Sequence, residues 1–265
     1  MAGLLFAAVI FSFAIGSNAD MIQPRRLVNS HTAGVLPKGY YDFETRIYTP
    51  LDGMYGTGMM MGLSVGLTDR LDIGIMYGGD GIIGSGKPRL NRSPGVQVKY
   101  RLFEEGFAAP ALAFGYDHQG YGGVAAGTDF DYDGYLYKSP GFFISASKNF
   151  LMLNKIQIGF HGSANYSLEE RLNIHWPNFA LGLDMGFNEE LSIVLEYDMG
   201  LNDRAFDDSK HARIHKGYLN AGLRWAFTPS FYIELDFKDL LENKGTEGRR
   251  WGWSREMKIV YYSHF

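Results

Sequence analysis

The sequence has 265 residues, a formal net charge of −4 and no cysteine. It contains no long run of basic residues, so nothing indicates a nucleic-acid partner, and the lack of cysteine excludes a disulfide framework or a thiolate metal site. The 34 glycines, the aromatic content of 15% and the mean hydropathy of −0.15 together fit a β-barrel that crosses a membrane, because only every second residue of a spanning strand faces lipid.

Residues 1–19 are predicted to be a secretory signal peptide. Residues 4–15 form an apolar run too short for a spanning helix, and Ser17 and Ala19 supply the small residues of a cleavage site. Residues 20–39 show no clear period, so we expect an irregular segment that lies either in the periplasm or inside a barrel lumen. Residues 40–265 are predicted to form one transmembrane β-barrel.

The clearest strand pattern lies in residues 55–77. Alternate residues from Tyr55 to Leu67 are almost all apolar, those between them are mostly small, and the pattern resumes after a polar turn at 68–70. Side chains on a strand alternate between its two faces, and a strand of about ten residues with aromatic ends is typical of a tilted membrane-spanning strand. This stretch therefore predicts a membrane β-hairpin.

The same pattern recurs along the chain and predicts about twelve strands. Short turns alternate with longer polar connections, which is typical of a closed antiparallel up-and-down barrel with both chain ends on one side of the membrane. The apolar residues Leu63, Ile73, Leu183 and Leu223 are expected to point away from the barrel axis, whereas a soluble β-sandwich or lipocalin-like barrel would bury them. The predicted strands are residues 41–48, 55–67, 71–77, 96–102, 110–116, 142–146, 156–166, 179–187, 191–199, 219–227, 231–238 and 251–265.

The row opposite the apolar residues carries charges of both signs and is predicted to line the lumen. One interpretation is a wet lumen whose charges select solutes. The other is a self-neutralising network that fills a small barrel. Inward glycines such as Gly66 and Gly182 leave room on the inner wall, which is compatible with a narrow or gated passage. The candidates are Asp42, Glu44, Arg46, Asp72, Lys99, Arg101, Asp184, Glu196, Asp198, Arg224, Glu234, Asp236, Lys238, Glu256 and Lys258.

The C-terminal strand ends on an aromatic residue. Ile259, Tyr261 and Phe265 share the outward parity, and this resembles the C-terminal signal by which bacterial barrel proteins are recognised for outer-membrane insertion. The resemblance implies the bacterial outer membrane as the location and the barrel-assembly machinery as a partner. Basic residues of the outer loops are candidates for contacts with lipopolysaccharide phosphates, or are ordinary solvated charges; they are Lys87, Arg89, Arg92, Arg249 and Arg250.

Three aspartates suggest a weak metal site. Asp129, Asp131 and Asp133 match the first half of a calcium-binding loop, but Pro140 stands where the closing glutamate should be, so this is not an EF-hand. A looser surface Ca²⁺ site in an outside loop and a simple strand extension both remain open. No other cofactor is indicated.

A histidine and a serine share one face of a strand at His161 and Ser163. The pair resembles the His-x-Ser pair of outer-membrane phospholipase A, which implies lipid hydrolysis. Here the parity of Ile158 and Phe160 turns the pair toward the lumen, away from lipid, and no polar group that would orient the imidazole is evident on the neighbouring strands. No catalytic residue is therefore predicted.

Residues 94–105 (PGVQVKYRLFEE), 110–115 and 145–150 are similar to the barrel repeat of YjbH-type outer-membrane proteins. That resemblance implies a part in exopolysaccharide production or export. We expect a monomeric, non-enzymatic barrel that acts as a passive or gated channel or as the membrane component of envelope or exopolysaccharide export. The expected partners are membrane lipid, lipopolysaccharide and a small solute or polysaccharide. The alternative is a structural or adhesive barrel with a plugged lumen that acts through its outside loops, and the third hypothesis is a lipid hydrolase.

Overall fold

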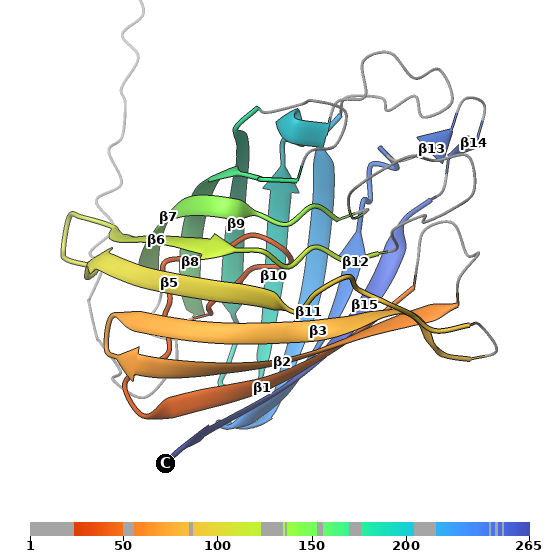
Figure 1. Cartoon of the computed structure of the whole chain (residues 1–265). Coiled ribbons are helices and arrows are strands. Elements are labelled where there is room, and N and C mark those ends of the chain that lie inside the picture. The colour runs from red at the N-terminus through yellow and green to blue at the C-terminus, as the bar shows by residue number, and fades with distance from the viewer. Residues whose placement is uncertain are drawn as a thin grey trace, which may run out of the picture.

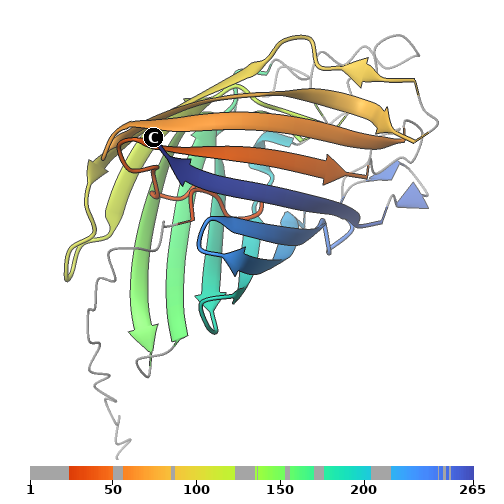
Figure 2. The same cartoon turned by 90° about the horizontal axis from the view of Figure 1, so that it is seen from below.

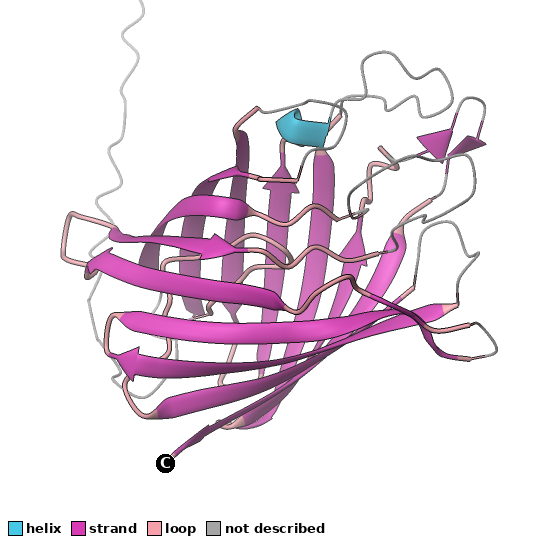
Figure 3. Ribbon diagram, viewed as in Figure 1, coloured by secondary structure: helices cyan, strands magenta, loops and turns pink. Residues whose placement is uncertain are grey.

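Twelve long antiparallel strands close into a single barrel in a computed structural model of the chain (Figures 1 and 3). The structure describes residues 24–49, 56–84, 87–122, 135, 137–152, 156–169, 176–203, 216–243, 245–246, 249–250 and 252–265. Among these residues no helix is long and apolar enough to cross a membrane.

The barrel strands follow one another around the ring in chain order. They are β1 (Tyr40–Tyr48), β2 (Thr57–Thr68), β3 (Leu71–Ile83), β5 (Gly95–Phe103), β6 (Ala111–Asp117), β7 (Gly141–Met152), β8 (Ile156–Tyr166), β9 (Asn178–Gly186), β10 (Leu191–Asp198), β11 (Tyr218–Thr228), β12 (Phe231–Lys238) and β15 (Ser254–His264). Short additions outside the ring are β4 (Arg89–Leu90), β13 (Gly245–Thr246), β14 (Arg249–Arg250) and the 3₁₀ turn η1 (Leu201–Asp203).

The first and last strands pair and close the ring. In β1 and β15, Phe43 lies opposite Tyr261, while β1 also pairs with β2, so neither strand has a free edge. Closure matters because lipid offers no hydrogen-bond partners to an unpaired backbone. The prediction of a closed antiparallel barrel of twelve strands is confirmed.

Short turns and longer connections lie at opposite ends of the barrel. The chain ends of the barrel meet at the short-turn end, where Gly39 N–H donates to the Gly66 carbonyl and Phe265 N–H donates to the Gly39 carbonyl. Figure 1 shows the C-terminus at this end. The alternation predicted from the sequence is therefore observed, except that the turn predicted at Asn154 lies outside the described residues.

The outer surface is apolar along the length of the strands. Leu63, Ile73 and Leu223 have 45%, 39% and 41% of their surface exposed, and Leu183 has the parity opposite to buried Asp184. A row of large exposed apolar side chains around a closed ring is what a lipid-facing surface requires. The prediction that these residues point away from the axis is confirmed.

Several strand boundaries differ from the sequence-based prediction, and β3 in particular continues to Ile83 instead of ending at residue 77. Strand β7 continues to Met152, because it pairs with β8 along its full length. The last strand begins at Ser254 instead of residue 251. Pro110 lies just before β6, and a register shift between Arg101 and Phe103 disturbs the adjacent ladder, as the missing proline donor suggested.

Several predictions fall outside the described residues. These are the signal peptide 1–19 and the aspartates of the calcium hypothesis, Asp129, Asp131 and Asp133. Within the described part of the chain, no group of three or more potential metal ligands is present.

Candidate functional site

A segment that precedes the first strand lies inside the barrel. Residues 24–38, here called the lumenal hairpin, turn back on themselves through an antiparallel bridge between Arg26 and His31 and a hydrogen bond of 2.9 Å from Leu27 N to Ser30 O. Val28 and Leu36 are completely buried. Figure 2 shows the hairpin in red, crossing the interior between opposite walls. The sequence left open whether this irregular segment is periplasmic or lumenal, and the structure places residues 24–38 in the lumen.

Charged wall residues hold the two legs of the hairpin. Arg25 forms ion pairs with Asp42 and, at 3.3 Å, with Asp72. The buried Lys99 ammonium donates to the carbonyl of Arg25 at 2.8 Å and to that of Gly34 at 2.9 Å. Because the hairpin has no strand neighbour, side chains of the wall satisfy its backbone.

The tip of the hairpin is held in the same way. One carboxylate oxygen of Glu196 accepts the backbone N–H groups of Asn29 at 2.9 Å and Ser30 at 2.7 Å. On the other side, Lys258 donates to the Val28 carbonyl at 2.7 Å. Hydrogen bonds with an ionised partner are stronger than neutral ones, so these contacts contribute most of the polar attachment of the tip.

His31 anchors the hairpin to the opposite wall. Its Nε2 lies 2.9 Å from Asp117, which also accepts from Arg26 at 2.6 Å, and its ring stacks on Phe143 with centroids 3.9 Å apart. Burial and the guanidinium of Arg26 lower the pKa of His31 well below its ordinary value. Because the Asp117 carboxylate can only accept, Nε2 is the ring nitrogen that donates to it.

Apolar contacts of the hairpin fall in three small separate clusters, and inward glycines make room for the hairpin. Leu27 and Val28 pack on Val194. A Cβ at Gly182 would lie 2.3 Å from Leu27 Cδ1, and one at Gly66 would lie 2.0 Å from the Pro37 carbonyl oxygen. The space that these glycines leave on the wall is thus occupied by the hairpin.

A second charged network extends along the wall from Lys258, which also contacts the tip of the hairpin. Lys258 lies 2.8 Å from both Glu234 and Asp236, and Lys238 pairs with Glu256. Opposite charges meet across neighbouring strands, so no ring of one sign forms. Arg224–Glu234 and Arg46–Glu44 complete this network.

All fifteen predicted lumen-lining residues have inward parity, and eleven of them are buried. Five contact the hairpin: Asp42, Asp72, Lys99, Glu196 and Lys258. The wall network contains Glu44, Arg46, Arg224, Glu234, Asp236, Lys238 and Glu256. Arg101 lies at the short-turn rim, 3.0 Å from Glu104, while Asp184 contacts His161 and Asp198 lines a cavity.

His161 is oriented by a carboxylate that the sequence did not reveal. Its Nε2 lies 2.5 Å from Asp184 and its Nδ1 2.8 Å from Ser147, so the expectation of no orienting polar group is wrong. The diagonal placement of Asp184 depends on the register between β8 and β9. All three side chains are buried, and Ser147 Oγ also accepts the Ala33 N–H at 2.9 Å. These hydrogen bonds hold the hairpin in place. Because Ser147 is buried among them, an ester cannot reach its hydroxyl.

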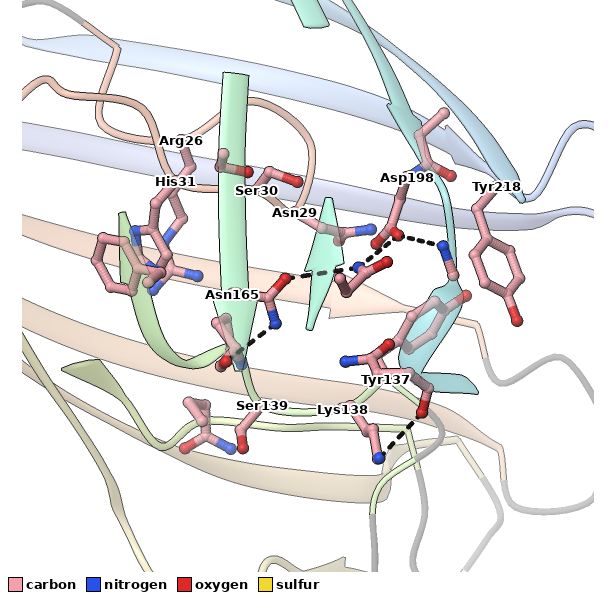
Figure 4. Close-up of a pocket in the computed structure, with 18 of the residues that line it drawn as sticks. Arg26, Asn29, Ser30, His31, Tyr137, Lys138, Ser139, Asn165, Asp198 and Tyr218 are labelled. Carbon is pink, nitrogen blue, oxygen red and sulfur yellow. Dashed lines mark hydrogen bonds between the residues drawn. The ribbon is translucent and has the colours of Figure 1, made fainter. Parts of the chain in front are cut away.

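A polar cavity of about 100 Å³ lies between the hairpin and the long loops (Figure 4). Amides and hydroxyls dominate its wall. Asn178 donates to Asp198 at 2.7 Å, and Asn165 donates to the Pro140 carbonyl at 3.0 Å. Other lining residues are Asn29, Ser30, His31, Arg46, Tyr121, Lys138, Ser163, Asn202 and Asn220.

The aromatic side of this cavity contains neutral phenols. Burial and the carboxylate of Glu256 raise the pKa of Tyr121 well above its ordinary value. Its hydroxyl lies 3.0 Å from the side-chain oxygen of Asn29, which ties the tip of the hairpin to the loop that follows β6. Tyr137 stacks on Tyr121 with ring centroids 4.8 Å apart.

The residues of the predicted insertion signal lie on the outer face. Tyr261 is 45% and Phe265 81% exposed, while Ile259 is half-buried on the same side of β15. Arg89 and Arg92 are exposed near the long-loop end. Their roles in assembly and lipopolysaccharide contact stay predictions.

The closed ring, its apolar exterior and its polar interior define the class of this protein: a membrane-spanning β-barrel of the outer-membrane type, with an N-terminal hairpin in its lumen. No protein-family model matches the chain, and no curated protein matches it.

Several solved barrels are similar in shape. An outer membrane channel from Pseudomonas putida F1 has 12% identity and a TM-score of 0.47, with 86% of this chain and 97% of that chain covered. The KdgM porin has 9% identity and a TM-score of 0.44, and the NanC porin 10% and 0.42, each with 85% of this chain and 99% of that chain covered. Similarity at this level carries no argument about function.

Proposed function

We propose that the protein is a gated channel of the bacterial outer membrane, and that the lumenal hairpin is its gate. The observation that carries the proposal is the chemistry of the hairpin contacts. Most are ion pairs or hydrogen bonds to backbone groups, and each can be exchanged for water when the lumen fills. A large continuous apolar interface would resist such exchange, but the apolar contacts of the hairpin are divided among three small separate clusters, around Val194, around Ala113 and around Val260.

The short connection between the hairpin and the barrel also supports the role of the hairpin as a gate. Gly39 joins the hairpin directly to β1, and the Lys38 N–H donates to the Asp69 carboxylate in the short turn at 3.1 Å. Displacement toward the short-turn end would therefore leave the ring of strands unchanged. A passage lined by charges of both signs would then suit small hydrophilic solutes.

A disulfide tether tests the gate. The chain has no cysteine, so Ala33→Cys and Ala113→Cys, two positions that pack in one buried cluster, introduce a single pair. We expect the oxidised double variant to be silent in planar bilayers and the reduced form to conduct as each single variant does. Equal conductance before and after oxidation, with the disulfide verified by mass spectrometry, would refute the gate.

The second candidate is a permanently plugged structural or adhesive barrel. It is favoured by the number of anchors, which hold the hairpin at both legs and at the tip. Absence of current at all voltages in the wild type, the reduced double variant and a variant with a weakened anchor would remove the channel and leave this candidate.

A role in exopolysaccharide export, as the membrane component of an envelope assembly, is a finer proposal that rests on the sequence resemblance to YjbH-type barrels. Reduced export by cells that lack the protein, restored by the wild type but not by the oxidised tether, would support it. Lipid hydrolysis is the weakest candidate, because Ser147 and His161 are buried against the hairpin.

A further inference from the structure

We propose that the cavity between the hairpin and the long loops is a binding site for a small neutral polyhydroxy compound, such as a sugar ring or a cyclic polyol. Such a compound would be a ligand of the proposed channel, so its biological role rests on the proposed function. The site itself is argued from the cavity wall alone.

Two side chains that line the cavity each carry one buried polar atom without a partner within the described residues. They are His31 Nδ1 and Arg46 Nη2, on side chains that are each 2% exposed. An unsatisfied buried polar group costs about 1–3 kcal/mol, but both atoms are covered by protein, so the groups that a ligand in the cavity would meet are the less buried ones.

Less buried parts of the wall add further hydrogen-bonding groups. Asn29 uses its oxygen for Tyr121, whereas its Nδ2 makes no hydrogen bond to the described residues. The same holds for the side-chain amide of Asn202 and the hydroxyl of Ser163. Donors and acceptors thus alternate around one space. A hydroxyl group both donates and accepts, so a ligand with several hydroxyls matches this wall better than one with a single kind of group.

The two arginines of the cavity wall are already paired with carboxylates and its Asp198 is hydrogen-bonded, which favours a neutral ligand. Arg26 lies against Asp117, and Arg46 against Glu44 and Glu256. Asp198 accepts from Asn178 at 2.7 Å and from the backbone N–H of Gly200 at 2.8 Å. An ionised ligand would lose its hydration without gaining an unpaired opposite charge.

The size of the cavity agrees with this class. At roughly 10–15 Å³ for each water position, 100 Å³ holds several waters, comparable to the hydroxyl-bearing ring of one sugar. The lattice of hydrogen bonds through Asn165, Asn178 and Asp198, drawn in Figure 4, fixes one side of the cavity before any ligand arrives. Such preorganisation lowers the entropic cost of binding.

Binding is tested on the detergent-folded full chain by saturation-transfer NMR and calorimetry. The probes are D-glucose, D-galactose and myo-inositol, with D-glucuronate and D-glucosamine as charged comparators. We expect at least one neutral probe to bind, and Asn29→Ala and Asn202→Ala each to weaken its binding roughly five- to tenfold, the effect of losing one hydrogen bond. Ser163→Ala serves as a further cavity variant if an asparagine variant does not fold.

The matched control is Asn188→Ala, in the short turn between β9 and β10 at the opposite end of the barrel, which should bind as the wild type does. No binding by any neutral probe, equal binding by the cavity variants and the wild type, or preference for a charged comparator would each overturn the inference. The binding assay does not depend on conduction. A barrel that binds a probe but never conducts would therefore refute the channel function and still support the binding site.

Discussion

Glu196 offers the most direct test of how the hairpin is held. Its carboxylate accepts the two N–H groups at the hairpin tip, at 2.9 and 2.7 Å, and no other side chain accepts from them. The substitution Glu196→Ala removes both bonds and leaves β10 intact. We therefore expect the hairpin to leave the lumen more often, while the barrel still folds.

The magnitude follows from the two charge-assisted bonds. Each contributes about 1.5–3 kcal/mol when its partner is ionised. Water from the adjacent cavity will reach the freed N–H groups, so the lower end applies, about 3 kcal/mol for the pair. A difference of 3 kcal/mol corresponds to roughly a hundredfold change in the ratio of displaced to docked hairpin.

The assay is single-channel recording, in which the ratio of open to closed time should rise roughly a hundredfold for Glu196→Ala. Glu196→Gln keeps one acceptor oxygen, so its ratio of open to closed time should lie between those of Glu196→Ala and the wild type. Glu189→Ala, which removes an exposed carboxylate at the short-turn end, is the matched control and should gate as the wild type does. Identical closed times in folded Glu196→Ala and the wild type would refute the assigned role of the tip contacts.

Other parts of the structure give further expectations. Lys99→Met removes the donor to two hairpin carbonyls and should accelerate tryptic cleavage at the arginine pair 25–26 by at least about tenfold, scored against the wild type on gels. Leu63→Arg should lower the unfolding free energy in liposomes by about 2–4 kcal/mol, whereas Leu240→Arg, beyond the end of β12, should cost about 0–1 kcal/mol; equal costs would contradict the lipid-facing assignment. Phe265→Ala should slow assembly into outer membranes without a change in unfolding free energy, measured by pulse-chase and urea titration. His161→Ala should leave lipid turnover unchanged, and a loss of turnover would restore the hydrolase hypothesis.

The barrel could be predicted from sequence because its physical cause is local. Lipid on one face and polar lumen on the other impose a period of two on every strand, so the pattern around Leu63 and Ile73 suffices to assign both faces. Because successive strands run in opposite directions, the connections between them lie alternately at the two ends of the barrel. The end of a strand could not be predicted where backbone pairing with the neighbouring strand, and not the hydropathy pattern, extends it, as at Met152.

The hairpin could not be predicted because its contacts join distant parts of the chain. His31 and Asp117 are separated by 86 residues, and Ser30 and Glu196 by 166. Nothing in an aperiodic segment indicates which wall residues it meets. One signal was present: Gly66 and Gly182 leave room on the inner wall. From the sequence alone this room suggests a passage, but the hairpin occupies it. For the same reason the contact between His161 and Asp184 could not be predicted, since it depends on the register between two strands.

The hairpin also explains why the lumen carries both signs of charge. An irregular segment inside a barrel has backbone carbonyls and N–H groups that no ladder satisfies. Lys99 supplies donors to its carbonyls, and Glu196 supplies acceptors to its N–H groups. Each wall charge that serves the backbone in turn needs a counter-charge, which the wall network provides around Lys258. Mixed charge is therefore the expected partner of backbone groups that no strand ladder satisfies, and in the proposed gate it would meet solutes only after the hairpin leaves.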